Sequence, residues 1–157
     1  MGLLRDMKEA RFWKTWKDRF EDERSLFITP NNPSVSQAAD RASRRGLSRK
    51  ETAMDVWEYI YDNVDYILSK RWKTPAETLR ERTGDCEDVT FLAASMLVSL
   101  GIDDFTIEIG ELIYPDGRVE LHTWVEVDDL VVDPTGSPRK NPVLKYRSVQ
   151  SYRINAS

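Results

Sequence analysis

The sequence contains one cysteine, Cys86, and one histidine, His122. A single cysteine excludes an internal disulfide, so nothing in the sequence indicates an oxidising compartment. The longest apolar stretches are far too short to cross a bilayer. The first residues become charged at Arg5 and Asp6, without the apolar core of a signal peptide. We therefore expect a soluble, cytoplasmic protein with no membrane partner.

Basic residues are nearly absent from the middle of the chain. Arg118 is the only Lys or Arg between residues 83 and 133, a stretch that carries 13 Asp and Glu. An acidic field of this kind disfavours nucleic acid and acidic substrates, and it suits a cation or a basic peptide. A solvated acidic face without any ligand explains the same charges, so both interpretations stay open.

Helical patterns fill the first part of the 157-residue chain. Residues 3–23 are predicted to form an amphipathic helix, because apolar residues recur there every three or four positions. This stripe consists of Leu4, Met7, Ala10, Trp13, Trp16 and Phe20. Large apolar side chains at helical spacing usually belong to a core, so we expect the stripe to pack on its own domain. The alternative is a contact with a partner or within an oligomer.

Further helix starts are marked by capping residues. Ser34 can cap a short helix that stops at Gly46, and Ser48 with Glu51 forms a capping box. Thr74 and Glu77 repeat that signature, with proline at the first helical position between them. The next helix begins near Cys86 and is apolar almost all round, which predicts a position at the centre of the domain. Gly101 is expected to end it.

After this central helix the apolar period changes from three or four residues to two. The stretches 105–114, 118–127 and 130–133 are predicted to form antiparallel strands. Helices followed by strands predict an α+β fold, in which the central helix carries Cys86 at its N-terminus and packs on an antiparallel sheet, with extra N-terminal helices. We expect one domain over residues 1–157. It divides into a helical extension (1–45), a core (48–136) and a C-terminal tail (137–157).

The predicted strands bring His122 and Asp133 together. If Asp128 and Asp129 form a two-residue hairpin turn, Asp133 lies opposite Trp124. His122 and Trp124 share one face of their strand because side chains alternate. Asp133 then lies one diagonal step from His122, within reach of its side chain.

Cys86 experiences two opposing influences in the sequence. The start of a helix stabilises a thiolate, so we expect Cys86 to be alkylated in the folded protein faster than a free thiol at pH 6. Asp85, Glu87 and Asp88 oppose ionisation because they place like charge beside the sulfur. Asp85 as N-cap with Asp88 at the third helical position would remove part of this conflict, and a bound cation would also do so.

Three blocks resemble the transglutaminase-like cysteine peptidase superfamily, which has a papain-like arrangement, and bacterial transglutaminase-like cysteine proteinases in particular. These blocks are residues 72–79 (WKTPAETL), residues 84–88 (GDCED), and residues 122–127 (HTWVEV) with Asp133-Pro134-Thr135. The resemblance implies Cys86 as nucleophile, His122 as general base and acid, and Asp133 as the residue that orients the imidazole. It implies a thiol hydrolase, a cysteine peptidase or amidase, that acts on a protein or peptide through a thioester.

Two other activities stay open beside this hypothesis. An amine instead of water would resolve the same thioester in a protein-glutamine transamidase, and a catalytically silent domain of this fold would serve as a binding module. The resemblance requires no cofactor. It also implies a candidate calcium site at Asp85 and Glu87, although helix capping is the interpretation we favour for these acids.

Overall fold

The structure, a computed structural model, describes residues 3–138 and 144–155, with side chains from Phe12 onward except Trp13. The helices within these residues are α1 (Leu3–Phe27), α2 (Pro33–Ala42), α3 (Arg49–Asn63), α4 (Pro75–Glu81) and α5 (Cys86–Ser99). The strands are β1 (Asp65–Tyr66), β2 (Thr83–Gly84), β3 (Phe105–Ile113), β4 (Val119–Val127), β5 (Leu130–Val132) and β6 (Lys145–Ile154). The predicted α+β class is confirmed, because helices precede an antiparallel sheet.

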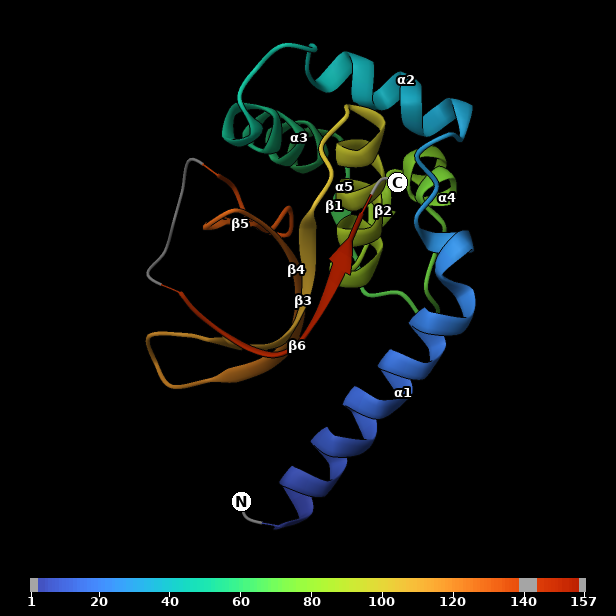
Figure 1. The fold of residues 1–157 in the computed structure, drawn as a ribbon. Helices are drawn as coiled ribbons and strands as arrows, with labels where there is room; N and C mark the ends of the chain where they lie inside the picture. Colours follow the sequence, from blue (N-terminus) through green and yellow to red (C-terminus); the bar gives the residue numbers. More distant parts are fainter. Residues whose placement is uncertain (1–2, 139–143, 156–157) are drawn as a thin grey trace.

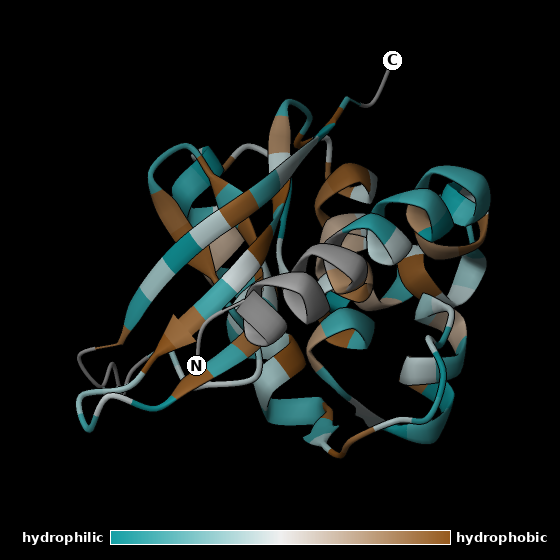
Figure 2. Cartoon of the chain, turned by 90° about the horizontal axis from the view of Figure 1, so that it is seen from below, coloured by the Kyte–Doolittle hydropathy of each residue, from teal (hydrophilic) through white to brown (hydrophobic). Residues whose placement is uncertain are grey.

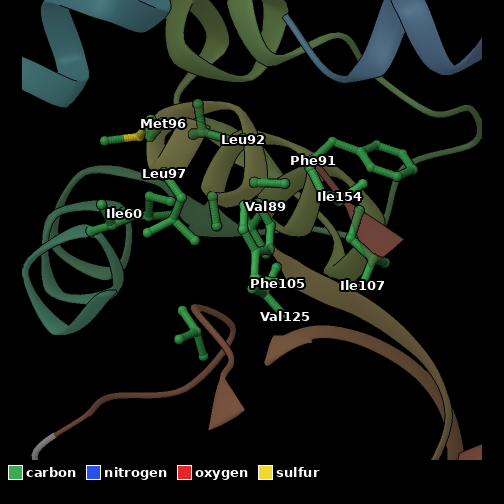
Figure 3. Close-up of a cluster of buried hydrophobic side chains, with 14 of the residues drawn as sticks. Ile60, Val89, Phe91, Leu92, Met96, Leu97, Phe105, Ile107, Val125 and Ile154 are labelled. Atoms are coloured by element: carbon green, nitrogen blue, oxygen red, sulfur yellow. The ribbon is translucent and has the colours of Figure 1, made fainter. Parts of the chain in front are cut away.

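Helix α5 lies at the centre of the molecule, packed between the sheet and helices α2, α3 and α4 (Figure 1). Its apolar residues occupy all sides of the helix, so it can bury side chains in every direction. Figure 3 shows this core, in which Phe91, Leu92 and Leu97 of α5 are fully buried. The sheet contributes Phe105 and Ile107 from β3, Val125 from β4 and Ile154 from β6.

The helix ends agree with the predicted capping residues at α3, α4 and α5 but not at α2. Helix α2 is capped by Asn32 in place of Ser34, and it ends at Ala42, before Gly46. Thr74 and Glu77 form the expected capping box at α4. At α3, the Ser48 side chain accepts a hydrogen bond from the Glu51 backbone N–H at 3.1 Å. After α5, Gly101 adopts a φ of +86°, a left-handed conformation that glycine adopts without a steric penalty.

The main sheet has the strand order β5-β4-β3-β6, with all neighbours antiparallel. The turn between β4 and β5 has the predicted two-residue length, since Val127 pairs with Leu130 and Val125 with Val132. This turn gives the register expected between His122 and Asp133. In Figure 2 the strand that leads to the C-terminus, β6, is coloured mostly hydrophilic, with isolated hydrophobic bands.

Residues 145–154 correct the prediction of a C-terminal tail. They form β6, which pairs with β3 along its whole length, from Phe105↔Ile154 to Ile113↔Lys145. The sequence did not predict this strand because its exposed residues alternate only with half-buried ones until Ile154, so it has no continuous apolar face. A register shift between Ile109 and Gly110 accommodates the pairing.

The N-terminal helix α1 packs on the domain through the C-terminal part of its stripe. Trp16 is 3% exposed and Phe20 is 1% exposed, and both rings contact Phe91 of α5. The prediction that the stripe packs down is confirmed for these two residues. The other members, Leu4, Met7, Ala10 and Trp13, lie outside the described side chains. No helix in the described part of the chain is both long and apolar enough to cross a membrane.

A short parallel pair, β1 with β2, was not predicted from the sequence. Asp65 pairs with Thr83 and Tyr66 pairs with Gly84. Two-residue strands are too short to produce a periodic pattern, so no pattern in the sequence predicts them. This pair fixes the segment that starts at Asp65 directly beside the start of α5.

Candidate active site

Cys86 is the first residue of α5, where helix backbone N–H groups have no partner within the helix. Asp85 is the N-cap and forms a capping box with Asp88. Gly84 is required just before them, because a Cβ there would lie 2.8 Å from Asp88 Cβ. This close contact restricts position 84 to glycine in the turn that leads into α5, directly before the N-cap Asp85 and the first helical residue, Cys86.

The buried carboxylate of Asp88 anchors the segment that leads into α4. It accepts hydrogen bonds from the Ser69 hydroxyl at 2.7 Å, the Lys73 backbone N–H at 2.8 Å and the Asp85 backbone N–H at 3.1 Å. Two of the three resemblance blocks therefore meet here, since Lys73 belongs to the first and Asp88 to the second. Asp88 has a structural role that holds the residues in front of Cys86 in place.

His122 and Asp133 form a buried pair. His122 Nε2 lies 2.9 Å from Asp133 Oδ2, and the two residues are 6% and 3% exposed. Burial alone would raise the pKa of Asp133, but hydrogen bonds from His122, Tyr146 and Thr135 hold this pKa below its usual range. The ionised carboxylate accepts a hydrogen bond from Nε2–H, and with the proton on Nε2 the Nδ1 atom is free to act as a base.

Two aromatic side chains surround the imidazole. The His122 ring lies 6.2 Å from Trp124 and 6.3 Å from Tyr146, and these two rings are 5.0 Å apart. The Tyr146 hydroxyl also donates to Asp133 Oδ2 at 2.7 Å. Sequence reasoning missed Tyr146, because it lies on β6 and no local pattern links that strand to the residues around His122. Thr135, which donates to Asp133 Oδ1 at 2.7 Å, belongs to a resemblance block but was not assigned a role.

Helix α5 contacts β4 next to His122. The hydroxyl of Thr90, one turn after Cys86, donates to the backbone C=O of Thr123 at 3.2 Å. A backbone hydrogen bond from Thr123 also reaches the Cys86 sulfur, and it acts to lower the pKa of the thiol. The cysteine therefore lies against the residue that follows His122. This brings three positions of the sequence, 86, 122 and 133, into one region of the molecule.

The surroundings of Cys86 favour the thiol over the thiolate. Burial raises the pKa of Cys86 well above its usual value, and the nearby charge of Glu87 adds to the effect. The thiol donates a hydrogen bond to Glu87 Oε2 at 3.2 Å. Burial and the acidic neighbours act against the expectation that the helix start makes Cys86 unusually acidic, and that expectation stays a prediction.

A family model described as the transglutaminase-like superfamily matches residues 36–134, which include Cys86, His122 and Asp133. The chain belongs to the transglutaminase-like superfamily. The resemblance of the three sequence blocks is thereby confirmed at the level of the superfamily. Membership supports an enzyme with cysteine hydrolase-type activity at the family level.

One solved structure with a similar fold is that of a "putative cysteine protease" from Cytophaga hutchinsonii. It shares 16% identity with this chain at a TM-score of 0.56, and the match covers 71% of this chain and 39% of that protein. At this identity the likeness concerns the fold, and the chain spans well under half of the matched protein. No curated protein matches the sequence.

The transglutaminase-like domain has an open pocket beside His122. The pocket has a volume of about 550 Å³. Its walls come from β1 and the segment after it, from β3 and the turn after it, from β4, and from the turn after β5. The lining residues are Tyr66, Leu68, Leu112, Tyr114, Glu120, Leu121, His122 and Thr135. The imidazole of the candidate triad is therefore accessible from a space large enough for a small ligand.

The candidate calcium ligands of this transglutaminase-like domain, Asp85 and Glu87, are engaged elsewhere. Asp85 accepts from the Asp88 backbone N–H at 3.2 Å and from the Ser69 backbone N–H at 3.4 Å. Burial, followed by the charges of Glu87 and Asp88, raises the pKa of Asp85 to about 7. Among the described residues no group of three or more His, Cys, Asp or Glu side chains could hold a metal ion. With Asp85 bound by backbone N–H groups and Glu87 by the Cys86 thiol, the two acids do not form a donor set that fits calcium.

Proposed function

We propose that this chain is a thiol hydrolase, a cysteine peptidase or amidase that acts on protein or peptide substrates. The observation that carries the proposal is the buried pair of His122 and Asp133, next to a cysteine at the start of the central helix. Each residue alone is common in a structural role. Their convergence next to an open pocket that His122 lines, within the residues that the superfamily model matches, is what supports catalysis.

The proposed reaction assigns one role to each residue. His122, oriented through Nε2 by the Asp133 carboxylate, takes the proton of the Cys86 thiol on Nδ1. The sulfur attacks an amide carbonyl, and the backbone N–H of Cys86 donates to the developing oxyanion. His122 then passes its proton to the leaving amine, and water hydrolyses the thioester that remains. Each proton taken from a nucleophile is returned to a leaving group or to the thiol.

Glu87 gives the free protein a resting state in this proposal. Its carboxylate holds the Cys86 thiol by a hydrogen bond and disfavours ionisation. The thiol has to turn from Glu87 to His122 before it can react. Bound substrate would cover the pocket and exclude water from the site. At that stage the imidazole serves as the acceptor of the thiol proton.

A second candidate, a catalytically silent binding module, is favoured by one observation. Cys86 is only 8% exposed and its thiol pKa is raised, which is typical of an inert, structural cysteine. In such a module the pocket beside His122 would bind a peptide without cleaving it. The two candidates differ in whether Cys86 ever forms a covalent bond with substrate.

The test is incubation with a library of peptides from a digested proteome, together with a primary amine that carries a fluorescent label. The hydrolase proposal predicts new peptide termini or a conversion of Gln to Glu, both absent with Cys86→Ser. Incorporation of the amine at glutamine would instead identify a transamidase. If the wild-type protein and Cys86→Ser leave the library equally unchanged, the chain is not a hydrolase and the silent module is the better account.

A further inference from the structure

Exposed apolar side chains gather beside the candidate active site. Among the described residues, the large hydrophobic side chains that stay exposed are few: Leu26, Tyr61, Tyr66, Ile67, Leu68, Val119, Leu121 and Val149. Five of these eight lie in two short segments, 66–68 and 119–121. Leu68 is the most exposed of all at 79%. Apolar groups that cluster on a surface indicate a binding site more often than single exposed residues do.

Three of these five side chains line one pocket. Tyr66 at the end of β1, Leu68 just after it, and Leu121 from β4 border the same space of about 550 Å³ as His122. Leu112 adds a further apolar wall, and it is itself buried. The patch is therefore continuous with the candidate catalytic base, and it is not a separate surface.

Backbone hydrogen bonds hold the segment 66–68 beside the residues that directly precede Cys86. Tyr66 pairs with Gly84, and the backbone N–H of Ile67 donates to the Gly84 carbonyl at 3.0 Å. Gly84 precedes Cys86 by two residues, so the apolar wall is anchored where α5 begins. The burial of Tyr66 and the charges of Cys86 and Asp85 raise the pKa of its phenol, so its hydroxyl remains a neutral donor near the sulfur.

We propose that this pocket binds a large apolar side chain of an extended peptide, next to the amide that is presented to Cys86. This inference rests on the proposed function and adds a substrate preference to it. A volume of this size fits one large side chain with its adjoining peptide units. Exposed Leu68 and Leu121 would lose water on binding, which provides the driving force.

Carboxylates at the rim set the charge that the pocket accepts. Glu120 lines the pocket. Asp85 and Glu87 flank Cys86 in the sequence, and their charges act on the phenol of the lining residue Tyr66. An acidic side chain in the substrate would meet like charge in a site partly withdrawn from water, so it should be rejected. The expected order of preference is therefore leucine first, glycine second and glutamate last.

The test uses covalent capture, because the natural substrate is not needed for it. Three peptidyl vinyl sulfones carry Leu, Gly or Glu at the residue next to the electrophile. The sulfur adds to the vinyl carbon, the π bond breaks, and the proton of the thiol ends on the neighbouring carbon, with no leaving group. Since Cys86 is the only cysteine, the gain in intact mass reports its capture directly. Iodoacetamide, which needs no subsite, measures the intrinsic reactivity of the thiol at the same pH.

The leucine reagent should capture Cys86 about tenfold faster than the glycine reagent or more, each normalised to iodoacetamide. Leu68→Ser and Leu121→Ser should each reduce this ratio severalfold without changing the iodoacetamide rate. Leu26→Ser is the matched control, because Leu26 is also exposed, at 53%, but lies at the end of α1 and does not line the pocket. It should leave the ratio unchanged.

Two outcomes would overturn the inference, and they are distinguishable. If Cys86 reacts with iodoacetamide in the folded protein but the three peptidyl reagents react equally, the subsite is wrong and the nucleophile stands. If none of the reagents labels the folded protein, the proposed function fails and the subsite fails with it. A ratio that falls equally in Leu26→Ser would show that the effect is not local to the pocket.

Discussion

Glu87 controls the state of the thiol in the free protein. Its carboxylate accepts the hydrogen bond of Cys86 at 3.2 Å, and its charge is the largest electrostatic contribution after burial to the raised thiol pKa. The backbone hydrogen bond from Thr123 acts in the opposite direction but does not outweigh it. A neutral side chain at position 87 should therefore free the thiol to ionise.

Glu87→Gln is predicted to lower the pKa of Cys86, because it removes a like charge while keeping the size of the side chain. Removal of a charge raises the ionised fraction at every pH below the pKa, so the profile of alkylation rate against pH should move to lower pH. A shift of about one pH unit corresponds to roughly tenfold faster alkylation near neutral pH. Glu21→Gln on α1 serves as the control, and an unmoved profile in Glu87→Gln would contradict the role given to Glu87.

Asp133 is the acceptor that fixes the imidazole. Asp133→Asn is predicted to reduce peptide hydrolysis by about 10²–10⁴-fold, because an amide neither stabilises an imidazolium nor specifies the tautomer as a carboxylate does. The circular dichroism spectrum should be retained, with a loss of stability of about 1–3 kcal/mol from the weakened hydrogen bonds. Tyr146→Phe removes one donor to Asp133 and leaves its charge, so it should cost less than tenfold. Equal losses in both variants would argue against the orienting role.

At the scale of single residues, the sequence predicted Cys86 and His122 because each is the only residue of its type. Asp133 was predicted because the two-residue turn at Asp128 determines which acid lies near the imidazole. Tyr146 was not predictable, because its place depends on a pairing between β3 and β6 some forty residues apart. The high thiol pKa was not predictable either, since burial at a helix start cannot be derived from spacing.

At the scale of elements, the N-terminus of α5 combines structure and chemistry. The capping box of Asp85 and Asp88 provides acceptors for the first N–H groups of the helix, as the spacing of the two acids predicts. Burial, followed by the charges of Glu87 and Asp88, raises the pKa of Asp85 to about 7. Helix capping explains the presence of Asp85 and Asp88 without a metal ion.

Calcium is predicted not to bind tightly at Asp85 and Glu87. A chelator should change neither the activity nor the melting temperature, whereas Asp85→Ala should cost about 0.5–2 kcal/mol through loss of the helix cap. Isothermal titration of the chelator-treated protein with calcium measures this directly. Micromolar binding that disappears in Glu87→Gln would show that the two acids form a calcium site after all.

The elements differed in how far their sequence patterns determined them. Strands β3 and β4 have strong periodicity, and helix α5 is a long apolar run between a capping residue and Gly101, so all three were predicted nearly to the residue. Strand β6 was missed, because Lys145, Arg147 and Ser148 keep much of it exposed at the edge of the sheet. The edge position relaxes the need for an apolar face, and so it removes the signal that sequence reasoning uses.

At the scale of the whole molecule, α1 belongs to the structure of the domain. Trp16 and Phe20 pack among aromatic rings from α5, from the segment before α4 and from β6, represented by Phe91, Trp72 and Tyr152. These contacts join the first helix to the last strand. The division of the chain into a helical extension, a core and a tail stays a prediction. Within the predicted tail, residues 145–154 form β6 and are part of the sheet.

Deletion of residues 1–24 is predicted to destabilise the protein or cause aggregation. It removes two buried aromatic side chains that contribute about 1.5–3 kcal/mol each, from a total stability of about 5–15 kcal/mol. Thermal unfolding followed by circular dichroism measures the loss. Deletion of residues 1–10 is the control, because it removes no side chain of the described core. An unchanged melting temperature after the longer deletion would identify α1 as a detachable contact for a partner.

The account depends most directly on whether His122 activates Cys86. The decisive measurement is the rate of Cys86 alkylation between pH 6 and pH 9 in the folded wild-type protein and in His122→Ala. We predict that the wild-type protein is labelled while folded, and that His122→Ala is labelled about tenfold more slowly near neutral pH, because the proton acceptor is gone. Labelling of the wild type only after denaturation, or identical profiles for the two proteins, would contradict the account.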